Sequence, residues 1–308
     1  MGASDMGDVV GATSASYEIL REQGLRSLNR GELQTAENSF EEALTRARES
    51  GDESLIDRAF CNFVAVEIIL GRVADSDLTR LREILMRNSD LENCWLAAYN
   101  LAHAHELRKA FKKGLFYARI SYDRAVALGR KDWRAISHNS IGNILIAESY
   151  FDQALAEYEQ ALELMPEERR LERALILDNL GYCRTVEGRY TEAFRDLYQS
   201  LRTLRTLGAR GFERYPRIDL CFAMLEVGRY RAAYRHGLLA LQIADSVGDD
   251  DIAKNALYLL GEAAHLSSDT RGAREHFRTL QKRFFPNDRY LPDFLLAIDV
   301  RKLINLRA

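Results

Sequence analysis

Apolar residues recur along the chain at three- and four-residue intervals, while Arg and Glu fill many of the positions between them. Leu177, Leu180 and Cys183 form one such stripe, and a similar spacing returns over residues 257–264. Residues at these intervals share one face of an α-helix, so each stretch predicts an amphipathic helix. Because the pattern continues from about residue 15 onward, we predict an all-α chain.

Small residues mark a second, longer period of 38 to 40 positions. Gly142 is followed twelve residues later by Ala154, and Gly181 is followed at the same distance by Ala193. Two antiparallel helices joined by a short turn approach to ~8–10 Å only where small residues face one another. The pairs therefore predict seven helical hairpins. The first small positions are Gly24, Val64, Ala102, Gly142, Gly181, Cys221 and Gly261, and the second are Ala36, Ser76, Gly114, Ala154, Ala193, Ala233 and Ala273.

A turn is expected between the two helices of each hairpin. Gly marks this turn in four hairpins, and Lys or Ser marks it in the other three. Each hairpin has an apolar face that it cannot bury alone, and stacking the next hairpin buries it, so the pattern predicts a solenoid. The expected turn residues are Gly31, Gly71, Lys109, Ser149, Gly188, Gly228 and Ser268.

Aromatic residues follow the second small position by four residues at Phe40, Tyr158 and Phe277, and Pro166 ends the fourth unit. With the twelve-residue spacing, these positions resemble the tetratricopeptide repeat (TPR). The period near forty is similar to the longer-helix variant of signalling scaffolds. The second and sixth units depart from the pattern, because Arg80 and Gly237 stand where an aromatic residue is expected.

The resemblance implies a right-handed α-solenoid of seven TPR-like hairpins with a C-terminal capping helix. We expect a flexible N-terminal tail over residues 1–14 and a capping helix over 289–308, which Pro292 begins. The apolar arc of this last helix is wider than a cap needs, so either the seventh repeat wraps around it or part of it contacts a second copy of the chain. The expected repeats cover about 15–52, 53–90, 91–130, 131–167, 168–209, 210–249 and 250–288.

In the TPR family the first helix of each hairpin lines a concave groove that binds a peptide. Several of the corresponding positions here hold Asn, whose amide can donate to and accept from a peptide backbone at once. The alternative is that these Asn side chains cap a neighbouring helix or face water. The expected groove residues are Asn62, Asn100, His103, Asn139, Asn143, Asn179, Tyr182, Asp219 and Glu262.

Composition and charge narrow the function further. The 308 residues hold 43 Lys and Arg against 46 Asp and Glu, a net charge of -3, which excludes a polybasic nucleic-acid coat. A basic belt over residues 106–134 could attract an acidic partner, or it could be a solvated helix face with internal ion pairs. No apolar run reaches the ~18 residues that a membrane span needs.

Candidate chemistry is sparse. The four Cys residues are scattered, so we expect them to be buried apolar residues. His103 and His105 point to different faces of a helix and cannot jointly hold a metal. No nucleophile-elbow, phosphate-loop or zinc-hydrolase motif is present, so we expect no metal, no cofactor and no enzymatic activity.

These observations predict a non-enzymatic, cytoplasmic scaffold or adaptor that binds a peptide or protein segment in its groove. The expected partner is a protein or peptide, with a homodimer through the C-terminal helix as a further option; nucleic acid and membrane are not expected. Two alternatives stay open. The chain also resembles bacterial peptide-pheromone receptors without their DNA-binding domain, and it could be the sensor subunit of a separately encoded protease or nuclease.

Overall fold

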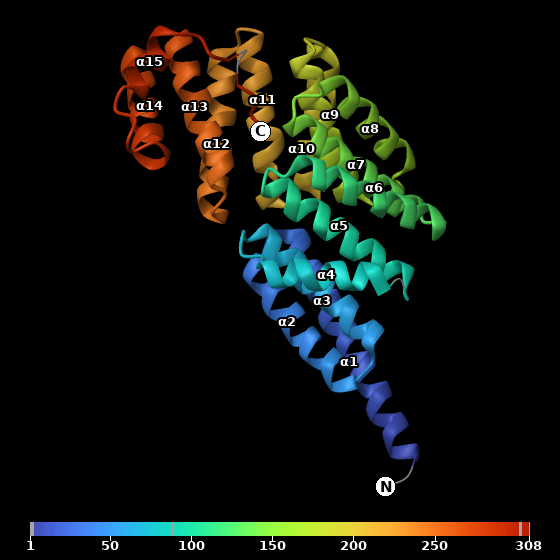
Figure 1. The fold of residues 1–308 in the computed structure, drawn as a ribbon. Helices are drawn as coiled ribbons and strands as arrows, with labels where there is room; N and C mark the ends of the chain where they lie inside the picture. Colours follow the sequence, from blue (N-terminus) through green and yellow to red (C-terminus); the bar gives the residue numbers. More distant parts are fainter. Residues whose placement is uncertain (1–2, 88, 302–303, 308) are drawn as a thin grey trace. The chain divides into compact units, whose positions relative to one another are not determined.

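The computed structural model describes the backbone of residues 3–87, 89–301 and 304–307, and side chains from residue 15 onward within these ranges (Figure 1). The described residues form fifteen α-helices, one short 3-10 helix and no strand, which confirms the all-α prediction. The chain divides into two compact units. Unit 1 comprises Met1–Ile144 with Glu163–Pro166, and unit 2 comprises Leu145–Leu162 with Glu167–Ala308.

Within each unit, consecutive helices pair into hairpins, in which a first helix lies beside a second helix. The hairpins of the first part of the chain are α1 (Ala3–Arg30) with α2 (Leu33–Ser50), α3 (Glu53–Ile69) with α4 (Asp75–Arg87), and α5 (Leu91–Leu107) with α6 (Phe111–Ala127). Next along the chain are α7 (Lys131–Ala147) and α8 (Phe151–Leu164). Unit 2 continues with α9 (Arg170–Val186) and α10 (Tyr190–Thr206), the 3-10 helix η1 (Arg210–Glu213), α11 (Arg214–Glu226) and α12 (Tyr230–Val247), α13 (Asp250–Leu266) and α14 (Thr270–Phe284), and α15 (Leu291–Ala297).

In the first, fifth and seventh hairpins the first small position lies where the two helices touch. A Cβ atom added to Gly24 would lie 2.7 Å from the Phe40 ring, and one added to Gly181 would lie 2.5 Å from Cγ of Leu197. At Gly261 the added atom would collide with the ring of Phe277. Because these neighbours are themselves buried, larger residues would force the helices apart. The second small residues Ala36, Ala154, Ala193, Ala233 and Ala273 are all fully buried. Ser76, the second small position expected in the second hairpin, is exposed instead.

The seven expected turn residues all adopt positive φ angles. The four glycines have φ between +70° and +78°, which glycine adopts without steric cost. Lys109, Ser149 and Ser268 take the same left-handed conformation, with φ of 56°, 64° and 67°. The turn geometry is therefore the same in all seven hairpins, whether or not the residue is glycine.

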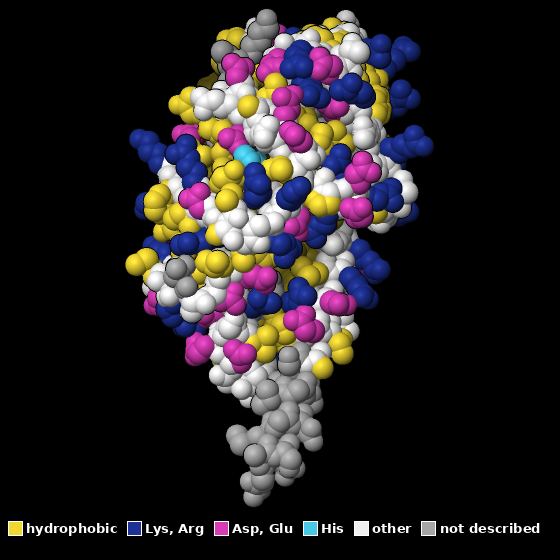
Figure 2. All heavy atoms as spheres, turned by 90° about the vertical axis from the view of Figure 1, so that its right-hand side faces the viewer, with side chains coloured by type: hydrophobic (Ala, Val, Ile, Leu, Met, Phe, Trp, Pro, Cys, Tyr) yellow, Lys and Arg dark blue, Asp and Glu magenta, His cyan; other side chains and the backbone are white. Residues whose placement is uncertain are grey.

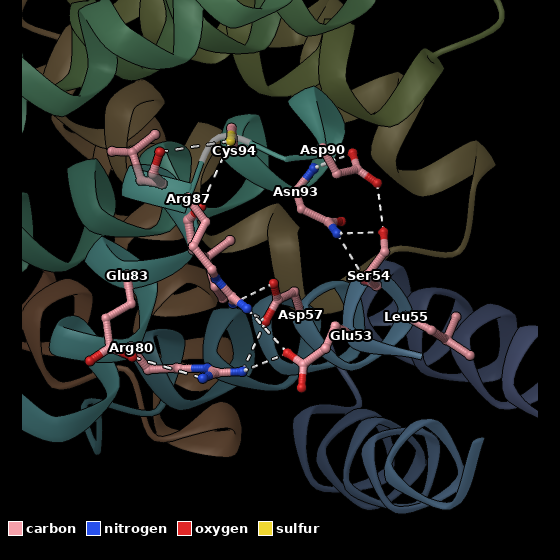
Figure 3. Close-up of polar contacts among 12 residues, drawn as sticks. Glu53, Ser54, Leu55, Asp57, Arg80, Glu83, Arg87, Asp90, Asn93 and Cys94 are labelled. Atoms are coloured by element: carbon pink, nitrogen blue, oxygen red, sulfur yellow. Dashed lines mark hydrogen bonds and ion pairs between the residues drawn. The ribbon is translucent and has the colours of Figure 1, made fainter. Parts of the chain in front are cut away.

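The second hairpin replaces its missing aromatic residue with an ion-pair cluster (Figure 3). Asp57 on α3 is 4% exposed, and its carboxylate accepts hydrogen bonds from Arg87 at 2.6 and 2.7 Å and from Arg80 at 3.1 Å. Glu53 accepts a further hydrogen bond from Arg87 at 3.1 Å. We call these four residues the Asp57 cluster; it joins α3 to α4 inside one hairpin.

The two ends of the chain differ from the prediction. Helix α1 begins at Ala3, so the backbone is already helical over residues 3–14, where we expected a tail without regular structure. At the other end, the expected capping helix stops early, because α15 ends at Ala297 and Ile298 is extended, with φ of −131° and ψ of 124°. The carboxylate of Asp299 accepts a hydrogen bond from the backbone N–H of Arg301 at 3.0 Å, a local turn that competes with helix. The prediction of one continuous helix over 289–308 is therefore wrong.

Candidate functional site

In unit 2 the residues that follow α15 lie against the first helices α9, α11 and α13. We call residues 299–301 and 304–307 the C-terminal segment. Val300 and Leu306 of this segment are buried, with 7% and 9% of their surface exposed. We call the surface of α9, α11 and α13 that contacts the segment the inner face of unit 2; its side chains are Asp178, Tyr182, Asp219, Glu226, Asn255 and Glu262.

Both main-chain polar groups of Leu306 are held by side chains of the inner face. Its N–H donates to the hydroxyl oxygen of Tyr182 at 3.1 Å, and its carbonyl oxygen accepts from the Asn255 amide at 2.8 Å. Tyr182 comes from α9 and Asn255 from α13. These contacts do not involve the Leu306 side chain, so they would accept the backbone of many other residues.

Asn305 continues this network on the other side of Tyr182. Its side-chain oxygen, Oδ1, accepts a hydrogen bond from the Tyr182 hydroxyl at 3.1 Å, and its side-chain nitrogen, Nδ2, donates to the main-chain carbonyl oxygen of Ile146 at 2.7 Å. The Tyr182 hydroxyl therefore acts as donor and acceptor at once. Burial raises the pKa of Tyr182 well above its usual value, so the hydroxyl keeps its proton at neutral pH.

The guanidinium group of Arg307 lies between two buried carboxyl groups, Asp178 on α9 and Asp219 on α11. We call these two residues the aspartate pair; they are 2% and 1% exposed. Nη2 of Arg307 donates to Oδ2 of Asp178 at 3.2 Å and also to Oδ2 of Asp219. The guanidinium carbon also lies 5.2 Å from the centre of the Tyr182 ring, within cation–π range.

The two carboxyl groups of the aspartate pair share a single cation, the guanidinium group of Arg307. Burial, together with the neighbouring charge of Asp219, raises the pKa of Asp178 well above its usual range, and burial also raises the pKa of Asp219. Burial would lower the pKa of Arg307, but the charges of Asp219 and Asp178 outweigh it and raise that pKa. The site therefore favours a permanent cation such as a guanidinium.

A second arginine of the C-terminal segment lies on the other part of the inner face. Nη1 of Arg301 lies 3.4 Å from Oε1 of Glu226 on α11, and its Nε lies 3.6 Å from Oε2 of Glu262 on α13. Glu262 is 2% exposed, and burial raises its pKa to about 7, although Arg301 opposes the shift. The inner face thus offers two acidic subsites, and each holds one arginine of the segment.

Three of the residues expected in the groove therefore converge on one site. Tyr182, Asp219 and Glu262 all contact the C-terminal segment. Asn179 lies on α9 next to Asp178 and is half-buried. The register of the first helices was thus sufficient to find half of the inner face.

The expected groove residues of unit 1 lie in other surroundings. Asn100 is 3% exposed and its amide donates to the carbonyl oxygen of Cys61 at 2.7 Å, so it ties α5 to α3. Asn100 therefore packs between two helices, which is neither the predicted groove position nor the alternative of capping a helix or facing water. Asn62 is half-buried near Tyr17, and burial lowers the pKa of His103 to about 4. Asn139 and Asn143 are half-buried on α7.

Three residues of the inner face are not among those predicted from the sequence: Asp178, Glu226 and Asn255. Asp178 lies three positions before the first small residue of its hairpin, and Asn255 lies six positions before. The signal for Asp178 was available, because it is an acidic residue inside the apolar run of α9 and is flanked by the buried Leu177. No feature of the sequence singled out Asn255, whose role depends on where the C-terminal segment lies.

The basic belt contains internal ion pairs. Arg108 donates to Asp75 at 2.6 Å, and Arg130 pairs with Asp132 at 2.9 Å while its guanidinium lies 4.4 Å from the Trp133 ring. On the face drawn in Figure 2, acidic and basic side chains are interspersed. These contacts favour the interpretation of the belt as a solvated helix face.

Metal and thiol chemistry find no support among the described residues. Within them, no three His, Cys, Asp or Glu side chains are grouped to hold a metal ion. All four cysteines are free and buried, as predicted, and burial raises the pKa of the Cys61 thiol above its usual value. Of the helices in these ranges, none combines the length and apolar character that crossing a bilayer requires.

No profile of a known protein family matches the sequence, and no curated protein matches it. The fold is similar to that of a Rap protein complexed with competence and sporulation factor, with a TM-score of 0.70 and 12% identity over 95% of this chain and 79% of that chain. The apo form of RapI is also similar, with a TM-score of 0.62 and 14% identity over 86% of this chain and 96% of that chain. The chain is a TPR-like helical repeat protein. As in the prediction, its hairpins form an α-solenoid.

Proposed function

We propose that this TPR-like protein is a non-enzymatic interaction protein that binds an extended peptide, or an extended segment of a partner protein, on the inner face of unit 2. The observation that carries the proposal is the pair of hydrogen bonds that the inner face makes to the main chain of Leu306. Both its N–H and its carbonyl oxygen are bound by side chains, Tyr182 and Asn255, that belong to two different repeats.

This arrangement suits a peptide ligand for a physical reason. A chain outside helices and strands carries unpaired N–H and C=O groups, and burying them without partners costs free energy. A hydroxyl and an amide supply those partners to Leu306, which lies in a turn, and can do the same for the backbone of another peptide. Selectivity then comes from the side chains on either side, here from the acidic subsites.

A peptide-switched regulator is the second candidate, and one observation favours it. The inner face already holds a segment of the same chain, so an incoming peptide has to replace that segment. Replacement of one bound segment by another changes the surface that the protein presents, which is how a ligand without enzymatic effect can act as a switch.

The test is selection of binders from a random peptide library with the full chain as bait, followed by fluorescence polarisation with the selected peptides. We expect Asn255→Ala to weaken binding about tenfold, because it leaves a peptide carbonyl group without its partner. Asn38→Ala is the matched control. Its amide is exposed on α2 of unit 1 and accepts a hydrogen bond only within that helix.

Two results would contradict the proposal. One is the failure of the library to yield any peptide that binds the wild-type chain. The other is a set of selected peptides that bind Asn255→Ala and Asn38→Ala with the same affinity as the wild type, which would place their site elsewhere.

A further inference from the structure

We propose that the C-terminal segment is a built-in ligand of the inner face of unit 2, and that the aspartate pair is an arginine subsite for which an arginine-bearing peptide competes with Arg307. The inference rests on the proposed function, because it names the ligand chemistry of the same site. It states that the C-terminal segment occupies the site when no ligand is bound. It also states that a ligand that displaces the segment must carry an arginine side chain.

Arg307 contacts only one oxygen atom of each carboxyl group of the aspartate pair. Both carboxylates are contacted through their Oδ2 atoms and through the same nitrogen, Nη2. Arg307 does not reach either buried Oδ1 atom, and the raised pKa of Asp178 lets the two carboxyl groups share a proton with each other. An arginine that engages a carboxylate with two nitrogens makes a stronger, bidentate pair. The pair can therefore accept more hydrogen bonds than the resident arginine gives it.

The groups that surround this subsite favour a guanidinium group over an ammonium group. Its walls are two carboxyl groups that are almost completely buried and the face of Tyr182. A planar guanidinium is weakly hydrated, stacks on aromatic rings and matches carboxylate geometry, whereas an ammonium group is strongly hydrated and cannot form the planar fork. The subsite should therefore discriminate arginine from lysine, which a simple acidic surface would not do.

The C-terminal segment is attached to the inner face without regular secondary structure of its own. Residues 299–301 and 304–307 contain no helix or strand, and the contacts described above bind them through side chains of α9, α11 and α13 and through the end of α7. Release of such a segment breaks no hydrogen bond within the helices. A tethered ligand also acts at an effective concentration of about a millimolar, so it lowers the apparent affinity of every competitor without sealing the site.

The acidic side chains of the inner face complement the positive charges of the C-terminal segment. Four acidic side chains, two in each subsite, meet the two arginines of the segment, and Arg301 also pairs with Asp299 of the segment itself. A cationic competitor can take the place of these arginines at the inner face. An acidic peptide would face four buried or half-buried carboxyl groups and is excluded on the same ground.

The probe for the test is a fluorescent synthetic peptide with the sequence of residues 299–308, DVRKLINLRA. Its affinity is measured by polarisation against the full-length wild type and against the full-length Arg301→Ala/Arg307→Ala variant, whose own segment is weakened. We expect the probe to bind the variant at least about tenfold more tightly than the wild type. The same peptide with its second arginine changed to alanine should bind the variant at least about tenfold more weakly than the probe does. A lysine at that position should restore only part of the loss.

Two further variants keep the test independent of folding. Asp178→Asn/Asp219→Asn in the background of the weakened segment should lose the preference for arginine over alanine. Arg307→Lys, which keeps the positive charge, should give an affinity for the probe between those of the wild type and the double arginine variant. Circular dichroism shows whether each variant keeps its helix content.

Hydrogen exchange of the segment separates this inference from the proposed function. In the wild type, the fragment that contains Leu306 should be protected, and Arg301→Ala/Arg307→Ala should remove that protection. Equal affinity of the probe for wild type and variant, or an unprotected segment in the wild type, would overturn the built-in ligand. Library peptides that bind without arginine and ignore Asp178→Asn/Asp219→Asn would overturn the arginine subsite while leaving the proposed function intact. A protected segment on a protein that binds no library peptide would instead refute the proposed function.

Discussion

The Asp57 cluster of unit 1 and the aspartate pair of unit 2 are both buried acidic sites bound by arginine, but their charges are arranged in opposite ways. In the Asp57 cluster one buried carboxylate meets two guanidinium groups, and both come from the partner helix of the same hairpin. In the aspartate pair two buried carboxyl groups share one guanidinium, and that group comes from a segment without regular structure.

The difference distinguishes an ion-pair cluster that stabilises helix packing from a site that can bind a ligand. A cluster whose cations belong to the same hairpin is complete as soon as the hairpin folds, and it takes the place of an aromatic residue between two helices. A buried pair of carboxyl groups whose one guanidinium comes from a distant segment is complete only when that segment arrives. Buried acidic groups alone do not identify a binding site; the origin of the cation and the number of carboxyl groups that share it do.

The largest effect on folding should come from Asp57→Ala. It removes the carboxylate that both Arg80 and Arg87 contact, although these arginines are more than a third exposed and can return to water. We therefore expect the free energy of unfolding to fall by about 2 kcal/mol, less than for a fully buried pair. Urea unfolding followed by circular dichroism measures the change.

The matched control is Asp75→Ala, which removes an exposed carboxylate from its ion pair with Arg108. The cost there should stay below about 1 kcal/mol, as for other surface pairs. If the two substitutions had equal effects, the Asp57 cluster would not stabilise helix packing as the comparison requires.

The second effect is a pH dependence that belongs to unit 2. The pKa of Glu262 is about 7 in the folded chain against 4.5 as its ordinary value, so the folded state holds this proton more tightly than the unfolded state. Its contribution to stability is fully present below about pH 4.5 and is lost as the pH rises through 7. Burial drives the shift, Arg301 opposes it and Asp299 adds to it.

Glu262→Gln should therefore flatten the decline in stability between about pH 5 and pH 8, by on the order of 2 kcal/mol across the window. The measurement is the urea midpoint of wild type and variant at several pH values, and the difference between the two curves isolates this carboxyl group. Parallel curves would show that Glu262 does not titrate in this range.

The smallest effect should come from Asp178→Asn. The substitution keeps the shape of the side chain and replaces a carboxyl group whose pKa is already raised by burial and by Asp219, so little attraction to Arg307 is lost. The free energy of unfolding should change by less than about 1 kcal/mol, in either direction. Asp57→Asn, the same chemical change in unit 1, should cost clearly more. Losses of equal size at both positions would remove the distinction between the two sites.

Local features of this fold were readable from the sequence because their causes are local. The helix pairs, the small positions such as Gly181 and Ala193, and all seven left-handed turns follow from residues less than forty positions apart. Even the turns at Lys109 and Ser149 were found, because the period placed them where glycine stands in other repeats.

The inner face was only partly predictable, because its geometry depends on distant parts of the chain. The repeat register found Tyr182, Asp219 and Glu262, which face inward by their position on a helix. It missed Asn255, whose partner is the Leu306 carbonyl group 51 residues away. The periodicity of residues 291–304 suggested a continuous helix, but apolar spacing does not reveal that Asp299 forms a local turn or that the inner face offers other partners.

The separation along the chain also sets the order in which the parts assemble. Contacts within a hairpin join residues close in sequence, whereas Asn305 reaches Ile146 across 159 positions and Arg307 reaches Asp219 across 88. Short-range contacts form fastest, and closing a long loop carries an entropic cost until the intervening chain is already structured. The C-terminal segment therefore docks last, on helices that are already in place. For that interval the nascent inner face is vacant, and a peptide present during folding reaches it before the chain's own arginine only at a concentration above the effective concentration of the tethered segment, about a millimolar.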